Sequence, residues 1–166
     1  MILDSGERRE FPSGAVRDIA DGKGRCDLLP LDVVAMILAP RSANTDSVLD
    51  YLGWYVREGN SSELHGAIDL FIQNNYENHT TAMLELSKHY EEGAKKYSDR
   101  NWEKGQFIHC FIDSGVRHYL KHLRGDTDER HDLAFMWNIM GAIWTIRHRP
   151  ELDDVEHAFA DKEATP

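Results

Sequence analysis

Residues 89–105 read HYEEGAKKYSDRNWEKG, and the rest of the chain is organised around this stretch. It joins the end of a helical pattern to a loop, and it holds acidic, basic, amide and aromatic side chains together. An apolar core does not need that mixture, and a solvated loop seldom carries aromatic residues such as Tyr97 and Trp102. The stretch therefore predicts one half of a metal–phosphate site, with the other half supplied by the two helical segments that follow.

The composition is that of a soluble globular protein. The 166 residues are 41% hydrophobic and 29% charged, which fits a single domain with a real core. No apolar run approaches the roughly 20 residues that cross a bilayer, so no membrane partner is expected. The first residues lack a secretory pattern, and Cys26 and Cys110 are interpreted as reduced thiols. These features predict a cytoplasmic protein.

The charge balance excludes one class of partner. The formal net charge is -10 and the pI is near 5.3, whereas broad nucleic-acid binding relies on a basic surface that neutralises phosphates. An acidic protein can still hold a small phosphorylated ligand when divalent metals and a few local cations cover its charge. We therefore expect no nucleic-acid partner, while a nucleotide ligand remains open.

Apolar residues recur at spacings of three and four, which is typical of helices, and no strand is expected. Residues 1–24 are predicted to form an irregular polar arm, and residues 151–166 an acidic, frayed tail. The helices expected between them span 31–38, 46–58, 61–72, 80–97, 104–123 and 128–147. The predicted fold class is all-α, a compact domain of about five to six helices over residues 25–150.

Several of these helices have a predicted core face, and on 128–147 it consists of Phe135, Ile139, Ala142, Ile143 and Ile146. The core-facing residues expected on 80–97 are Met83, Leu86, Tyr90, Gly93, Ala94 and Tyr97. Those expected on 104–123 are Ile108, Ile112, Val116, Tyr119, Leu120 and Leu123. Gly125 is a plausible C-terminal cap for the 104–123 helix.

The 80–97 helix also carries a polar line beside its core face. Glu85, His89, Glu92 and Lys96 follow one another at spacings of four, three and four. Oxygen ligands on adjacent turns suit Mg²⁺ or Mn²⁺, and a lysine one turn further on suits a phosphate oxygen. A solvated face with Glu–Lys pairs explains the same pattern, and the loop that follows, SDRNWEKG, favours the site.

The 104–123 helix carries two histidines and an arginine of interest. His118 and His122 are four residues apart, so they can share a metal, although such histidines are more often semi-buried residues with ordinary partners. Arg117 projects away from the apolar stripe and can pair with Asp113, four residues earlier. A metal site and a purely structural role both remain open for this helix.

The segment 125–138, GDTDERHDLAFMWN, is richer in candidate ligands. Its first carboxylates precede or open a helix, where they can cap it or bind a metal. His131 and Asn138 share one helix face, and an asparagine in an apolar helix needs a polar partner. Substrate, metal-bound water or an ordinary buried hydrogen bond would each satisfy it.

The sequence has no Gly-rich phosphate loop and no recognisable serine or cysteine nucleophile. If the protein is an enzyme, water activated by a metal is therefore the expected nucleophile.

Three blocks of the sequence together resemble a known family. They are GAVRD…GKGRCDLLP (14–30), HYEEGAKKYSDRNWEKG (89–105) and DSGVRHYLKHLRGDTDERHDLAFMWN (113–138). The chain resembles the phage and bacterial dATP/dGTP diphosphohydrolases, relatives in kind of the MazG-like all-α nucleotide pyrophosphohydrolases. The resemblance implies a MazG-like helical bundle that hydrolyses purine deoxynucleoside triphosphates to monophosphate and pyrophosphate with Mg²⁺ or Mn²⁺. In a phage this would remodel the nucleotide pool of the host cytoplasm.

The resemblance also implies roles for individual residues. The implied catalytic residues are Glu91, Glu92, Asp128 and His131. The implied metal ligands are Glu91, Glu92, Asp128, Glu129, His131 and Asp132. The implied substrate-binding residues are Lys95, Lys96, Arg100, Asn101, Trp102, Arg117, His118 and Asn138.

Two other functions stay open. The adjacent His131 and Asp132 are compatible with an HD-type phosphohydrolase, in which His89, His118 and Asp113 would complete the site. MazG-like enzymes place two glutamates three apart on one helix, where this chain has His89 and Glu92, so a catalytically weak nucleotide-binding protein is the other alternative. We further expect a homo-oligomer, a dimer or higher. The segment 40–79 is predicted to be an insertion atypical of the family.

Overall fold

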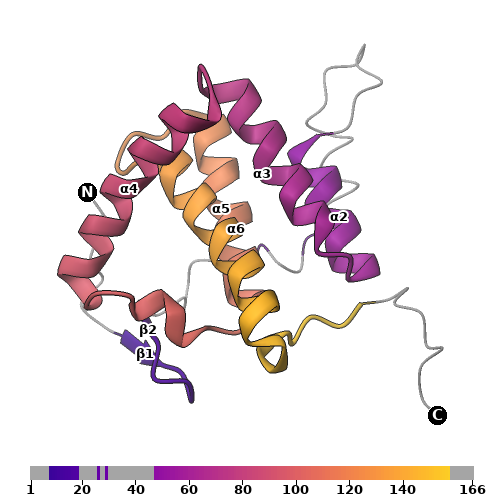
Figure 1. The fold of residues 1–166 in the computed structure, drawn as a ribbon. Helices are drawn as coiled ribbons and strands as arrows, with labels where there is room; N and C mark the ends of the chain where they lie inside the picture. The colour runs from indigo at the N-terminus through magenta and orange to yellow at the C-terminus, as the bar shows by residue number, and fades with distance from the viewer. Residues whose placement is uncertain (1–7, 19–25, 27–28, 30–46, 158–166) are drawn as a thin grey trace.

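The computed structural model describes residues 8–18, 26, 29 and 47–157. Within this part, five α-helices pack together and two short strands form a hairpin at one end of the bundle (Figure 1). The all-α prediction is confirmed. The helix predicted at 31–38 lies outside the described residues, as do Lys23 and Arg25 of the first block that carries the family resemblance. None of the described helices combines the length and the apolar character needed to cross a bilayer.

The helices follow the predicted order with small shifts at their ends. Their bounds are α2 Val48–Glu58, α3 Ser62–Asn75, α4 His79–Tyr97, η2 Asn101–Lys104, α5 Ile108–Arg124, α6 His131–His148 and η3 Pro150–Leu152. Helix α2 begins later than predicted, because Ser47 and Asp50 form a capping box in which each side chain bonds the other's backbone N–H. Gly125 ends α5 with a φ of 84°, as predicted.

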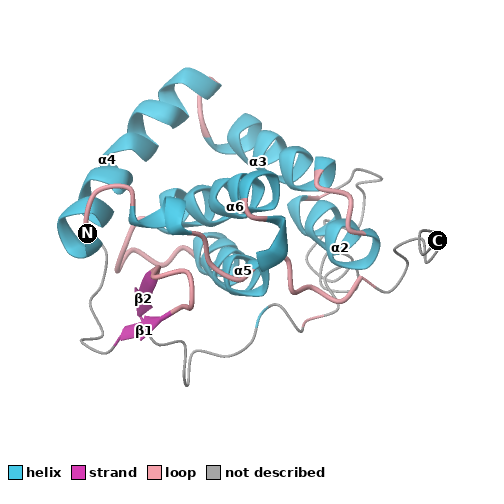
Figure 2. Ribbon diagram, turned by 60° about the horizontal axis from the view of Figure 1, so that its bottom comes forward, coloured by secondary structure: helices cyan, strands magenta, loops and turns pink. Residues whose placement is uncertain are grey.

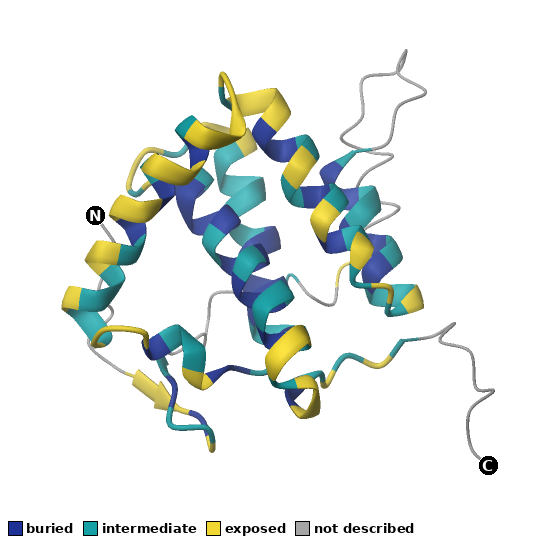
Figure 3. Ribbon diagram, viewed as in Figure 1, coloured by how far each residue is buried: buried dark blue, intermediate teal, exposed yellow. Residues whose placement is uncertain are grey.

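Helix α6 is the centre of the bundle. Figure 2 shows it surrounded by α3, α4 and α5, and its buried positions cover most of its circumference. Phe135, Ile139 and Ala142 are buried as predicted. Figure 3 shows the same division, with buried positions along α6 and exposed positions on the outer side of α4. The most apolar helix therefore provides a surface on which three others pack.

Helices α5 and α6 approach each other closely. A Cβ added at Gly141 would lie 2.5 Å from Cε1 of Phe111, whose side chain is fully buried. In the exposed part of α4, a Cβ added at Gly93 would meet nothing within 4 Å. The two glycines thus form a matched pair for testing the packing.

We expect Gly141→Ala to lower the free energy of unfolding by about 1–3 kcal/mol, because the new methyl group overpacks the seam between α5 and α6. Gly93→Ala should instead raise it by roughly 0.5–1 kcal/mol, because alanine has the higher helix propensity. Chemical denaturation of both variants measures the two changes. Equal effects at the two positions would contradict the packing described here.

Two predicted core faces are partly wrong. On α4 the buried side chains are Ala82, Leu86 and His89, whereas Met83 is 36% exposed and Leu84 65% exposed. Helix α4 contacts the bundle along a narrow edge, and this edge is rotated by about one residue from the predicted stripe. On α5, Leu123 is 52% exposed because it lies in the last turn, beside the polar loop that leads to α6.

The absence of strands was also predicted wrongly. β1 (Arg8–Glu10) and β2 (Val16–Asp18) pair antiparallel inside the segment predicted to be an irregular arm. Phe11 and Ala15 in the connecting turn are buried, and Gly14 adopts a φ of 78° that favours glycine. Strands this short are too brief to show an alternating pattern, so the contacts of the hairpin with the helices must stabilise it.

The first part of the predicted frayed tail is packed. Leu152 is buried in η3 and lies against Gly105, and the hydroxyl of Tyr55 donates a hydrogen bond to Asp153 over 3.2 Å. The carboxylate of Asp154 accepts a hydrogen bond from the backbone N–H of His109 over 3.1 Å. The prediction of fraying is therefore wrong for residues 151–157, and residues 158–166 lie outside the described part.

Candidate functional site

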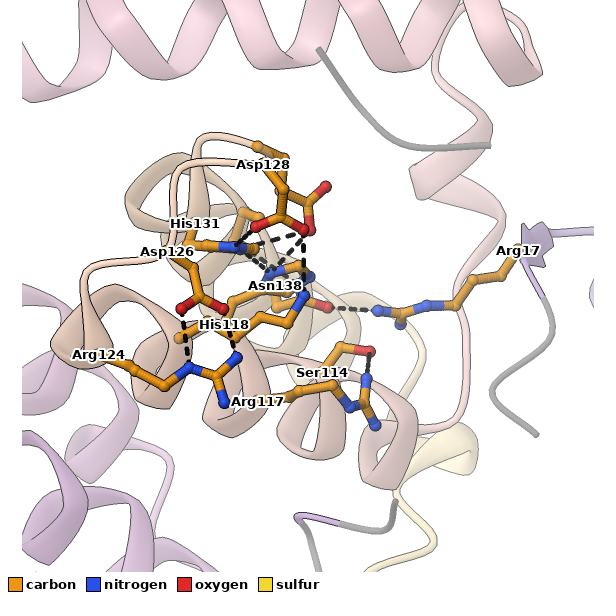
Figure 4. Close-up of polar contacts among 12 residues, drawn as sticks. Arg17, Ser114, Arg117, His118, Arg124, Asp126, Asp128, His131 and Asn138 are labelled. Atoms are coloured by element: carbon orange, nitrogen blue, oxygen red, sulfur yellow. Dashed lines mark hydrogen bonds and ion pairs between the residues drawn. The ribbon is translucent and has the colours of Figure 1, made fainter. Parts of the chain in front are cut away.

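His118 on α5 and His131 at the start of α6 lie side by side (Figure 4), and Glu129, just before α6, lies beside both. Nδ1 of His118 lies 3.0 Å from Nδ1 of His131 and 3.3 Å from Oε1 of Glu129. Nδ1 of His131 lies 3.4 Å from the same glutamate oxygen. The side chain of His131 is only 1% exposed. We refer to these three side chains, His118, Glu129 and His131, as the triad.

The other nitrogen of His131 faces the loop before α6. Its Nε2 lies 2.8 Å from Oδ1 of Asp128, whose side chain is 44% exposed. Asp126, in the same loop, is bound by the guanidinium of Arg124, with 2.7 Å between Nε and Oδ1. The left-handed turn at Gly125 makes this possible, because it reverses the chain and brings the acidic loop back against α5.

The described residues include two groups of three side chains whose ligand atoms lie within 4.8 Å of one another. One group is the triad, and the other consists of Asp126, Asp128 and His131. Imidazole nitrogens and carboxylate oxygens are ligands that divalent metals accept. This end of the bundle can therefore hold a divalent ion, and three of the predicted ligands, Asp128, Glu129 and His131, lie here.

The electrostatics of the site favour neutral imidazole and anionic ligands. Burial, together with the nearby His131, Arg17, Arg117 and Lys121, lowers the pKa of His118 to about 3. A hydrogen bond from His131 holds the pKa of the Asp128 carboxyl below its usual range. His118 is therefore neutral near pH 7, and the surrounding cations create a positive potential that attracts an anion.

The partner of Asn138 is Arg17, which comes from strand β2. Nη2 of Arg17 donates to Oδ1 of Asn138 over 2.7 Å, and Nη1 donates to Oε1 of Gln106 and to the carbonyl of Cys110, each over 3.1 Å. Figure 4 shows the arginine reaching α6 from the hairpin. All three acceptors are neutral, and burial lowers the pKa of the guanidinium.

Arg17 was not predicted as a site residue. The expectation that Asn138 needs a polar partner is confirmed, but this partner is an arginine 121 residues away in sequence rather than substrate or water. The only signal in the sequence is that Arg17 lies in the first of the three blocks that carry the family resemblance. Its partner on α6 could not be read from that block.

Arg117 pairs with Asp113, as the spacing predicted. It also donates to the hydroxyl of Ser114 over 3.3 Å. His118 and His122, by contrast, do not share a site: Nε2 of His122 lies 2.9 Å from the side-chain oxygen of Asn75 on α3. The interpretation of the two histidines as one metal-binding pair is therefore not supported.

The opening stretch, 89–105, contacts the hairpin. Nζ of Lys96 lies 2.9 Å from a carboxylate oxygen of Asp18, and the hydroxyl of Tyr97 donates to the other oxygen over 3.0 Å. The side-chain amide of Asn101 donates to the carbonyl of Val16 over 3.2 Å. Lys96 and Asn101, expected to bind substrate, and Tyr97, expected on the core face, thus hold strand β2 against the helices, and through it Arg17.

The remaining predicted residues of this stretch lie on its outer surface or in an aromatic cluster. Glu91 pairs with Lys95, and Arg100 pairs with Glu103, in exposed contacts. Glu92 is exposed, and of the described residues neither it nor Glu91 belongs to a group that could hold a metal. The structure therefore does not bring these two glutamates together with the carboxylates of 128–132, because the outer face of α4 points away from α6.

Trp102 packs edge to face against two other aromatic rings. Its ring centroid lies 5.7 Å from that of Tyr90 and 5.2 Å from that of Trp144. Such contacts are typical of a structural aromatic residue. Substrate binding, the role that the family resemblance implies for Trp102, is not needed to explain its position.

Asp132 points away from its neighbour His131. Its carboxylate accepts from Arg130 over 3.0 and 2.7 Å and from the hydroxyl of Tyr76 over 2.5 Å. Although burial opposes it, this hydrogen bonding lowers the pKa of Asp132 to about 2. An HD-type site needs the histidine and the aspartate on one metal, so this geometry argues against the HD alternative and against Asp132 as a ligand.

His89 is buried on the core side of α4, and burial lowers its pKa to about 4. Between pH 6.5 and pH 4 the unfolded chain therefore binds more protons than the folded one, and stability falls as the pH falls through this range. The loss at pH 4 amounts to about 3 kcal/mol from this residue. We expect His89→Leu to reduce the pH dependence of the unfolding free energy by that amount, in denaturant titrations at pH 7 and pH 4 without metal. An unchanged pH dependence would contradict it.

One known protein family is similar to more than half of the chain. The family model described as dATP/dGTP diphosphohydrolase, N-terminal, matches residues 60–155. No curated protein and no solved structure matches the chain. The matched region begins inside the segment 40–79 and contains α4, α5, α6 and the triad. The match covers more than half of the sequence, so the chain belongs to the family of dATP/dGTP diphosphohydrolase N-terminal domains.

Proposed function

We propose that this protein is a metal-dependent hydrolase that converts dATP or dGTP to the monophosphate and pyrophosphate. The observation that carries the proposal is the cluster of His118, Glu129, His131 and Asp128, which lies within the region that matches the family model. Two histidines and carboxylates at one buried corner have a clear use in holding a divalent ion. A role in remodelling the nucleotide pool of a phage-infected cell is part of the same proposal.

The cations near the cluster would bind the triphosphate. Arg17, Arg117 and Lys121 are close enough to His118 to lower its pKa. Lys95 and Arg100 instead pair with carboxylates on the outer surface, and Lys96 pairs with Asp18. We therefore assign phosphate binding to the first set of cations and assign Lys96 and Asn101 to holding the hairpin.

In the reaction, the oxygen of a water molecule bonds to the α-phosphorus, the bond from that phosphorus to the bridging oxygen of the β-phosphate breaks, and pyrophosphate leaves. A bound divalent ion supplies Lewis acidity toward the phosphate oxygens and makes water a better nucleophile. The protein side chains orient the substrate. Arg17 and Arg117 balance the negative charge of the triphosphate. Asn138 accepts a hydrogen bond from Arg17 and so fixes its guanidinium beside the site. The proton released from water passes to the carboxylates or to solvent.

The experiment is a screen of the purified chain against each deoxynucleoside triphosphate with Mg²⁺ or Mn²⁺, in which pyrophosphate is separated from phosphate and triphosphate. We expect pyrophosphate and monophosphate from dATP or dGTP. Release of triphosphate or inorganic phosphate would favour an HD-type reaction. Thermal stabilisation by a nucleotide without any hydrolysis would show a binding protein instead of an enzyme.

A homo-oligomer remains part of the proposal. Met83 and Leu84 are exposed on the outer side of α4, and single exposed apolar residues of this kind do not by themselves define an interface. Light scattering of the purified chain would measure its mass in solution. A monomer at micromolar concentration would remove this part of the proposal without affecting the hydrolase activity.

A further inference from the structure

The geometry points to a defined metal centre, in which His118, Glu129 and His131 are the ligands and Asp128 is a positioning residue that acts through His131. Such a centre would select a transition-metal ion such as Mn²⁺, Co²⁺ or Zn²⁺ over Mg²⁺. This inference deepens the proposed function and rests on it for the role of the metal. The geometric case stands on the described side chains alone.

The three ligand atoms have the spacing that one ion requires. A metal–ligand bond of about 2.1 Å places two ligands about 3.0 Å apart when they subtend a right angle, and about 3.4 Å apart at a tetrahedral angle. The three edges of the triad measure 3.0, 3.3 and 3.4 Å. A single ion can therefore contact all three atoms without any rearrangement, on one face of a tetrahedron or octahedron.

The protons of His131 support the same arrangement. A carboxylate only accepts hydrogen bonds, so the Nε2 of His131 that lies 2.8 Å from Asp128 carries the hydrogen. In the neutral imidazole, Nδ1 is then an acceptor, and its lone pair points toward His118 and Glu129. A carboxylate oxygen and an imidazole lone pair would repel each other at 3.4 Å unless a cation or a proton lies between them.

This assignment separates the roles of the two aspartates. Histidines that bind metals commonly donate their other N–H to a carboxylate, which fixes the ring and raises its basicity. Asp128 has this position relative to His131, and Lys121 lies 3.4 Å from its second oxygen. Asp126 is bound by Arg124. Asp128 was predicted to be a ligand, whereas the geometry gives it an orienting role.

The choice of metal follows from the ligand set. Mg²⁺ prefers oxygen ligands and keeps several waters, whereas imidazole nitrogen suits the later first-row metals. Two imidazoles and one carboxylate are a typical set for such ions. We expect the chain to bind Mn²⁺ and Co²⁺ at least tenfold more tightly than Mg²⁺.

The test uses the full chain after treatment with a chelator, and it measures binding of Mn²⁺, Co²⁺ and Mg²⁺ by calorimetry and the visible spectrum of bound Co²⁺. Glu129→Gln and His118→Ala should each weaken Co²⁺ binding by more than about 100-fold and change its spectrum, because each removes a ligand. Asp128→Asn should weaken binding by roughly 10- to 100-fold while the spectrum stays unchanged, because the ligands remain. Asp126→Asn is the matched control in the same loop and should bind Co²⁺ like the unmodified chain.

Circular dichroism checks that each variant folds, and Glu129→Gln is nearly isosteric, so it remains informative if His118→Ala does not fold. The inference is overturned if Glu129→Gln binds Co²⁺ normally while Asp126→Asn and Asp128→Asn do not, because the second group of side chains would then be the site. Equal affinity for Mg²⁺ and Mn²⁺ would also overturn it. Tight Co²⁺ binding without pyrophosphate release would remove the proposed function and leave the metal centre intact.

Discussion

Replacing His131 with alanine is expected to lower the rate of pyrophosphate release by a factor on the order of 10³. His131 is the one side chain common to both groups that can hold a metal, and it is almost completely buried. Its loss removes a ligand and also leaves Asp128 without its partner. A metal contributes several kcal/mol to the stabilisation of charge in the transition state, so the loss should appear in kcat rather than only in KM.

The measurement is a steady-state assay with dATP and dGTP over a range of metal concentrations. His122→Ala is the matched control, because this histidine lies one turn beyond His118 on the same helix but bonds to Asn75. We expect the control to keep its activity within about a factor of two and to lose at most about 1 kcal/mol of stability. Full activity of the folded His131→Ala variant would refute the site proposed here.

The second large effect is expected at Arg17. Replacing it with methionine keeps most of the apolar stem but removes the guanidinium that donates to Asn138, Gln106 and the carbonyl of Cys110. Buried acceptors that lose their donors cost roughly 1–3 kcal/mol each when water cannot replace it. We expect the free energy of unfolding to fall by about 3 kcal/mol and kcat/KM to fall at least about tenfold, because the guanidinium also balances substrate charge.

Arg9→Met is the control for this variant. Arg9 pairs with Arg17 across the hairpin, but its side chain is exposed and lies over the ring of Phe11. Its loss should cost at most about 1 kcal/mol of stability and leave kcat/KM unchanged. Denaturation curves and steady-state kinetics of the two variants give the comparison. Equal behaviour of Arg9→Met and Arg17→Met would mean that the hairpin contributes only general surface charge.

Much of the fold could be predicted because helices depend on local spacing. The order and approximate bounds of five helices, the turn at Gly125 and the buried face of α6 all follow from residues within a few turns of one another. The predictions were wrong where an element is too short, or too weakly patterned in its apolar residues, for local spacing to define it. The three-residue strands of the hairpin and the core face of α4 depend on neighbours that are distant in sequence.

For the candidate site, the structure brings together those predicted residues that are close in sequence. Asp128, Glu129 and His131 are close in sequence and were expected to act together, and His118 joins them from α5, on the other side of the loop 125–130. Glu91 and Glu92 were expected to join the same site from another helix, and the structure does not bring them there. The spacing of residues along one helix predicts on which face of that helix a residue lies. It does not predict how far that face is from another helix.

The sequence by itself determined the helical class, the acidic character of the loop before α6 and the family resemblance, because each depends on residue types at short separations. Only the tertiary structure decided that the stretch 89–105 holds the hairpin, and that Arg17 reaches Asn138 from the far end of the chain. The physical reason is that a buried guanidinium takes whichever acceptors the packed helices leave unsatisfied. Those acceptors are defined only once α5 and α6 have come together.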